Sequence, residues 1–285
     1  MSIRYNSLKQ LLVLLFLLVG TPVGFVQAQS KDASIAIGNT FTLESKVLGE
    51  VRRINVYYPP AYTESATVQL PVLYMPDGGM AEDFLHVAGL VQVLVGNGTM
   101  RPFILVGIEN TERRRDLTGP TTNEKDKKIA PHVGGSAAFR RFIRQELMPQ
   151  IRQRYRTTTE TAIVGESLAG LFVVETLLQE PDLFDTYLAF DPSLWWNNKQ
   201  QVKQASSFLQ TYTGKKKTLY MATSSEPEIA TDGRQFAEVL QATAKPIISW
   251  RFEPMPEETH ATIYHPAALK AFRYVFKPPV QGSAK

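Results

Sequence analysis

The feature that most limits the possible folds is a regular alternation of short apolar runs with amphipathic segments. Runs typical of strands occur at residues 71–75, 103–108, 161–164, 186–190, 218–222 and 247–252. Most lack polar alternation, as in strands covered on both faces. Apolar residues at helical spacing lie between them, for example in residues 84–95 and 139–151, and recur after the last run in residues 266–276. The pattern predicts a single α/β domain with a mostly parallel central sheet and helices on both faces.

Two segments depart from this alternation. Residues 41–58 carry alternating apolar and polar residues on both sides of a turn at Gly49, which predicts an opening β-hairpin. Residues 110–135 form a long, charged connection punctuated by Gly and Pro. Loops of this length are usually functional or mobile, so we expect this one to border a site.

The first 28 residues have the organisation of a cleaved signal peptide. Arg4 and Lys9 form a basic start, residues 11–19 are apolar, and Ala28 ends a small-residue cleavage signature. The apolar run is shorter than the roughly 20 residues that span a bilayer. We therefore expect cleavage after Ala28 and a mature domain over residues 29–285 that has no membrane anchor and is periplasmic or secreted.

Composition excludes several classes of function. The chain has 285 residues and no Cys, which rules out disulfides, thiolate metal sites and a cysteine nucleophile. The net charge of +4 is too mild for a nucleic-acid-binding protein. No His pair at ligand spacing and no Gly-rich phosphate loop is present, so neither a metal nor a nucleotide cofactor is predicted. Nothing in the sequence specifies an oligomeric state.

The sharpest motif is VGESLAG, residues 164–170, between an apolar strand and an apolar helix. A nucleophile elbow needs this context, with small residues two places before and after its serine. Gly165 and Ala169 occupy those places. The motif predicts that Ser167 is a nucleophile exposed at the carboxyl edge of the sheet.

A serine hydroxyl needs a general base, and imidazole is best matched to neutral pH. Of the four His, His260 follows the last strand, where the base of a Ser–acid–His chain order arrives. His265 is the alternative base. His86 and His132 are expected to be ordinary helix and loop residues.

The third member should be a carboxylate that orients the imidazole. Chain order places it after the strand at residues 218–222, where Glu226 is the first choice and Glu228 the second. Asp191, after the preceding strand, is a further candidate, although Asp-Pro also caps turns. A Ser–His pair without an acid remains open.

A developing oxyanion needs at least two hydrogen-bond donors. One expected donor is the N–H of Leu168, which follows the nucleophile. The other should come from the loop after residues 71–75, where Gly78 is the first choice and Gly79 the second, because glycine lets the backbone approach a ligand closely.

Two clusters are candidates for substrate contacts. Trp195 and Trp196 follow a strand at the expected ligand edge, so their indoles either wall a pocket or pack structurally. Arg113, in a run of three arginines, either attracts an anionic substrate or pairs locally. Because Glu112 and Asp116 adjoin the run, local pairing is the preferred interpretation.

Five segments together resemble the Putative esterase group of α/β-hydrolases, which includes enterochelin-type siderophore esterases and, more distantly, feruloyl esterases and mycolyltransferases. They are residues 71–79 (PVLYMPDGG), 106–117 (VGIENTERRRDL), 165–170 (GESLAG), 191–196 (DPSLWW) and 258–260 (ETH). The resemblance covers most of the mature chain. Asp191 stands where that group often has Ser.

The resemblance implies an α/β-hydrolase fold and an exported serine carboxylic-ester hydrolase that forms an acyl-enzyme on Ser167 with His260 as base. The expected partner is a small-molecule ester, with a siderophore ester among the candidates. Two alternatives stay open: an acyltransferase on the same fold, and a catalytically silent α/β-hydrolase that acts as a binding module.

Overall fold

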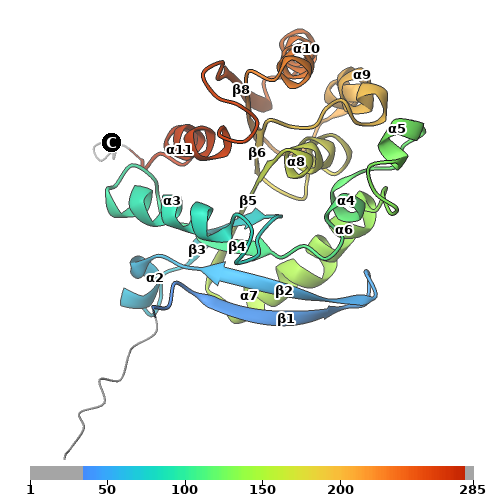
Figure 1. Ribbon diagram of the computed structural model, residues 1–285. Coiled ribbons are helices and arrows are strands. Elements are labelled where there is room, and N and C mark those ends of the chain that lie inside the picture. Colours follow the sequence, from blue (N-terminus) through green and yellow to red (C-terminus); the bar gives the residue numbers. More distant parts are fainter. Residues whose placement is uncertain (1–34, 280–285) are drawn as a thin grey trace, which may run out of the picture. The chain divides into compact units, whose positions relative to one another are not determined.

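An eight-stranded sheet in the order β1-β2-β4-β3-β5-β6-β7-β8 organises the protein (Figure 1). The computed structural model describes residues 35–279, so the predicted signal peptide lies outside the described residues. The strands are β1 (Asn39–Ser45), β2 (Glu50–Tyr57), β3 (Leu70–Met75), β4 (Ile104–Ile108), β5 (Thr157–Glu166), β6 (Thr186–Phe190), β7 (Lys217–Thr223) and β8 (Ile248–Pro254). Strand β2 pairs antiparallel with both β1 and β4, and the five pairs that link β4, β3, β5, β6, β7 and β8 are parallel. The predicted mostly parallel sheet is confirmed.

Helices cover both faces of this sheet (Figure 1). They are α2 (Pro60–Glu64), α3 (Phe84–Gly96), α4 (Arg113–Leu117), α5 (Glu124–Lys127), α6 (Ser136–Phe142), the π-helical η1 (Ile143–Leu147), α7 (Met148–Arg154), α8 (Leu168–Gln179), α9 (Trp196–Thr211), α10 (Pro227–Thr243) and α11 (Tyr264–Val275). Helices α3 and α11 pack on one face, and α6 to α10 contribute to the core on the other. This arrangement is the single-domain α/β fold that the sequence predicts.

Within residues 35–279, no helix combines the length and the apolarity that a bilayer crossing requires.

Helix α9 is the main element that the sequence patterns missed. Its surface is polar, and Asn197, Asn198 and Lys199 have left-handed backbone conformations near its start. Five residues of α9 are buried, including Val202, Ala205 and Leu209, so the apolar stripe is too thin to reveal the helix by periodicity alone. Its presence completes the connection between the parallel strands β6 and β7.

The long connection after β4 is tied to the fold by buried polar contacts. It contains the short helices α4 and α5, and the Asp126 carboxylate accepts hydrogen bonds from Asn197 N (2.8 Å) and Thr121 Oγ1 (2.7 Å). Asp126 is only 3% exposed. These contacts anchor the segment against the start of α9.

Candidate active site

Ser167 lies in a sharp turn between β5 and α8. Its backbone has φ 60° and ψ −120°, a conformation that is unusual for a residue with a side chain. A Cβ at Gly165 would lie 2.7 Å from Ala169, and a Cβ at Gly170 would lie 2.8 Å from the Phe190 carbonyl oxygen. The turn therefore excludes larger residues, as a nucleophile elbow does.

His260 faces the serine from the loop between β8 and α11. Its Nε2 lies 3.1 Å from Ser167 Oγ, and its Nδ1 lies 2.7 Å from Asp191 Oδ2. The loop is held by Ser225, whose N–H and hydroxyl both donate to the Glu258 carbonyl oxygen. The alternative base, His265, instead pairs with His86 at 2.9 Å. Sequence order therefore named the histidine that contacts the serine.

Asp191 is the carboxylate against the imidazole. It follows β6 directly, is fully buried, and has φ 45°. The Ser224 N–H donates to its Oδ1 at 2.5 Å, and the Ser224 hydroxyl donates to its Oδ2 at 2.7 Å. These bonds, made by the loop after β7, fix the carboxylate for its contact with His260.

Glu226, the first choice from the sequence, does not occupy the predicted place. It is exposed and is the N-cap residue of α10, and Glu228 is exposed in the first turn of the same helix. Neither carboxylate accepts a hydrogen bond from His260, whose Nδ1 contacts Asp191. The loop after β7 supplies Ser224 to hold the acid instead of supplying the acid. The signal for Asp191 was its position directly after β6, the strand beside β5.

The two expected oxyanion donors, the N–H groups of Leu168 and Gly78, have different environments. Leu168 is the first residue of α8, and the first N–H groups of a helix have no acceptor within the helix. The N–H of Gly78, however, donates to the Ile108 carbonyl oxygen at 3.0 Å, and that of Gly79 donates to Glu82 Oε2 at 2.6 Å. Gly78 is there for packing, because a Cβ would lie 2.3 Å from Gly107 Cα. Both glycine amides are thus engaged, which corrects the prediction of Gly78 as a donor.

Electrostatics around the imidazole favour its charged form. The hydrogen bond to Asp191 is the main cause that raises the pKa of His260 above 6.5, against an opposing effect of burial. Burial raises the pKa of the neighbouring Glu166 to about 7. Donor atoms of Glu166, Asp191 and His260 lie within 4.8 Å of one another. Within this group, the 2.7 Å distance between His260 Nδ1 and Asp191 Oδ2 is that of a hydrogen bond.

The two tryptophans have different environments. Trp196 is buried at 2% exposure, and its indole N–H donates to the Gly119 carbonyl oxygen at 2.9 Å. It therefore fastens the long connection, which corrects the prediction of Trp196 as a substrate contact. Trp195 is half-buried beside it, with ring centroids 5.9 Å apart.

Two of the three consecutive arginines of the long connection, Arg113 and Arg115, are paired with carboxylates. Arg113 binds the buried Asp77 through two bonds of 2.7 and 2.8 Å. Arg115 pairs with Asp116 at 2.7 Å and with Glu112 at 3.5 Å. This geometry favours the interpretation that the arginines stabilise the loop rather than recruit a substrate.

The Arg113→Gln substitution is expected to lower the free energy of unfolding by about 1–3 kcal/mol, because it leaves the buried Asp77 carboxylate without its charged partner. Any change in KM should be the same for an anionic and a neutral ester. Urea unfolding and ester kinetics check both points. Arg114→Gln is the matched control, since Arg114 is exposed and bonds only a carbonyl oxygen. A rise in KM confined to the anionic ester would contradict this account.

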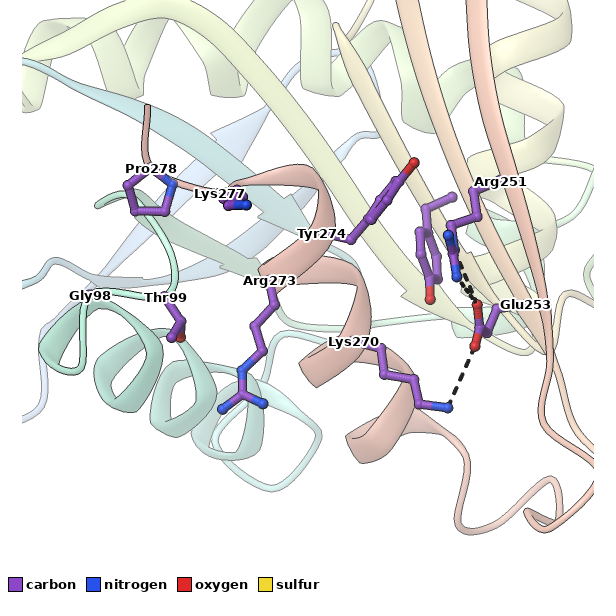
Figure 2. A pocket seen from close by; sticks show the side chains of 10 residues that line it. Gly98, Thr99, Arg251, Glu253, Lys270, Arg273, Tyr274, Lys277 and Pro278 are labelled. Atoms are coloured by element: carbon purple, nitrogen blue, oxygen red, sulfur yellow. Dashed lines mark hydrogen bonds and ion pairs between the residues drawn. The ribbon is translucent and has the colours of Figure 1, made fainter. Parts of the chain in front are cut away.

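A cavity of about 810 Å³ is lined by residues that include neither Ser167 nor His260 (Figure 2). Its lining residues are Gly98, Thr99, Tyr220, Arg251, Glu253, Lys270, Arg273, Tyr274, Lys277 and Pro278. Glu253 bonds Arg251 at 2.7 Å and Lys270 at 3.6 Å, which neutralises part of the positive charge. The cavity borders α11 and β8, and no member of the Ser167–His260–Asp191 chain lines it.

Known proteins are similar to this chain in sequence. A sequence model of the Putative esterase family matches residues 45–260. The ferri-bacillibactin esterase of Bacillus subtilis is 32% identical over 180 residues, 56% of this chain and 60% of that protein. The siderophore triacetylfusarinine C esterase of Aspergillus fumigatus is 30% identical over 57% of this chain and 58% of that protein. The chain thus spans about three fifths of the length of these two relatives.

Solved structures share the fold. An IroE-like serine hydrolase from Shewanella oneidensis is 31% identical with a TM-score of 0.76, over 84% of this chain and 80% of that one. The Shigella flexneri enterobactin esterase, solved with enterobactin, is 18% identical with a TM-score of 0.64, over 85% of this chain and 60% of that one. The family model matches most of the length of the chain, and the relatives agree with this match. The chain therefore belongs to the Putative esterase family, which has siderophore-esterase-like members.

Proposed function

We propose that this protein is a serine carboxylic-ester hydrolase that works through an acyl-enzyme on Ser167. The observation that carries the proposal is the continuous hydrogen-bonded chain from Ser167 Oγ through both nitrogens of His260 to the buried carboxylate of Asp191. A nucleophile, a base and an orienting acid in this relation define the serine-hydrolase constellation on any fold.

In the proposed reaction, His260 Nε2 removes the proton of Ser167 while Oγ attacks the ester carbonyl carbon. The Leu168 N–H donates to the oxyanion of the tetrahedral intermediate. His260 then gives the proton to the departing alkoxide, and the alcohol leaves. Water repeats the sequence on the acyl-enzyme, releasing the acid and restoring Ser167. Throughout, Asp191 stabilises the imidazolium that forms at each step.

The two alternatives differ in their outcome after acylation. An acyltransferase passes the acyl group to an alcohol, so the ratio of ester to free acid formed from a trapped acyl-enzyme separates it from a hydrolase. A silent binding module forms no acyl-enzyme. The complete Ser–His–Asp geometry argues against silence, because each of the three groups is oriented by its neighbour.

A siderophore ester is the proposed substrate class, since two of the relatives are named as siderophore esterases. The test compares p-nitrophenyl esters of increasing chain length with a siderophore trilactone and a feruloyl ester. A higher kcat/KM for the trilactone would support this class. A preference for the feruloyl ester or for a simple alkyl ester would assign another one, and no turnover of any ester would contradict the hydrolase.

We further propose export, with cleavage after Ala28. The protein isolated from the cell envelope is expected to begin near Gln29, because residues 1–28 combine a basic start, an apolar stretch and a small-residue cleavage signature. N-terminal sequencing of the native protein checks this, and an uncut Met1 would contradict it. Replacing Ala28 by a bulky residue is the matched control, since it should block processing at this position.

A further inference from the structure

Glu166 is a carboxylate beside the candidate triad with no role assigned so far. It ends β5, directly before Ser167, and its side chain is only 16% exposed. Its Oε1 lies 3.4 Å from His260 Nδ1, the atom that also contacts Asp191. This oxygen is buried and has no hydrogen-bond partner among the described residues. A buried carboxylate oxygen without a partner is costly and calls for an explanation.

The charges that surround Glu166 come from four other parts of the fold. His260 and Arg113 favour its ionised form, whereas Asp191 and Asp77 oppose it. Tyr264, from α11, also faces this group; burial raises the pKa of its phenol well above 10, so it stays neutral. Among residues 35–279, the cation within 4.0 Å of the Glu166 carboxylate is the imidazole of His260, once it is protonated.

We propose that Glu166 is a second positioning carboxylate for His260, which lies beside the Nδ1 N–H that Asp191 accepts and, when ionised, stabilises the imidazolium formed during catalysis. The inference rests on the proposed function. Asp191 makes the short bond and fixes the ring, while Glu166 contributes mainly charge across 3.4 Å in a site partly removed from water.

A pH dependence follows from this arrangement. Burial raises the pKa of Glu166 to about 7, so it ionises in the range in which His260 must lose its proton to act as a base. The two groups titrate as a coupled pair, and apparent pKa values belong to the pair. As pH falls, the enzyme takes up both protons, and log(kcat/KM) should fall with a slope between one and two. A single ionising base would give a slope of one.

The Glu166→Gln substitution tests the proposal because it keeps the shape and removes the charge. With a neutral p-nitrophenyl ester, the acid limb of kcat/KM should fall to a slope of one and move about one pH unit lower, because His260 loses a neighbour that raises its pKa. The high-pH plateau should drop by about tenfold, the equivalent of one pKa unit. Glu166→Asp keeps the charge and should retain the steeper limb.

Two controls keep the result interpretable. Glu253→Gln removes a carboxylate from the cavity beside α11 and should leave the profile unchanged. The unmodified enzyme provides a readout that needs no variant, since a wild-type slope of one would overturn the proposal. A Glu166→Gln profile in which kcat/KM falls by the same factor at every pH, with slope and midpoint unchanged, would also overturn the proposal. If wild-type Ser167 reacts with no phosphonate and no ester is hydrolysed, it is the proposed function that fails.

Discussion

Ser167→Ala is expected to reduce kcat for ester hydrolysis by about 10⁶-fold, the scale on which removal of a serine nucleophile acts when base and acid remain. The hydroxyl is the group that becomes acylated in the proposed reaction, and within residues 35–279 no other side chain is hydrogen-bonded to His260 Nε2. Assays of the release of p-nitrophenol from a p-nitrophenyl ester measure the loss of kcat. His260→Ala should be nearly as severe, because the members of such a unit act together.

The fold should survive both substitutions, which thermal unfolding checks. A phosphonate should label the wild-type protein at Ser167 and leave Ser167→Ala unlabelled. His265→Ala is the matched control, since His265 contacts His86 and not the serine. If His265→Ala were the inactivating change, or if another serine took the label, the assignment of nucleophile and base would be wrong.

Asp191→Asn should lower kcat by about 10⁴-fold, by analogy with the equivalent change in a serine protease. An amide in place of the carboxylate presents a donor to Nδ1 and stabilises the imidazole tautomer whose Nε2 carries the proton. That tautomer cannot accept the Ser167 proton. Because Ser224 holds Asp191 through both its N–H and its hydroxyl, Ser224→Ala should cause a smaller loss in the same direction.

Glu226→Gln and Glu228→Gln are the matched controls for the acid. Both carboxylates are exposed at the start of α10, so each variant should keep kcat within a few-fold of wild type. Kinetics at pH 8 and a full pH profile compare the wild type with Asp191→Asn, Glu226→Gln and Glu228→Gln. Near-normal activity of Asp191→Asn, together with a large loss in Glu226→Gln, would return the role of the acid to the loop after β7.

The tight turn that carries Ser167, the proposed nucleophile, could be predicted from the sequence because its requirements are local. A strand, a tight turn and a helix occupy consecutive residues around Ser167, and the small residues that the turn needs lie two places away on either side. The parallel sheet was predictable for a similar reason, since each apolar run and each amphipathic helix carries its own periodicity. His260 needed one non-local assumption, the order of the triad along the chain.

The identity of the acid depended on the tertiary structure. Asp191 and His260 are 69 residues apart, and several strand-end loops meet at one edge of the sheet. Only the packed fold determines that the loop after β6 supplies the carboxylate in contact with the imidazole, and that the loop after β7 holds this carboxylate. The same holds for Gly78, whose N–H is taken by Ile108 on the adjacent strand, and for Arg113, whose partner Asp77 is 36 residues away. The sequence by itself determined the local geometry of the turn that carries Ser167. The long-range partners of each polar group were decided only by the tertiary structure, because hydrogen bonds and ion pairs between loops leave no periodic pattern along the chain.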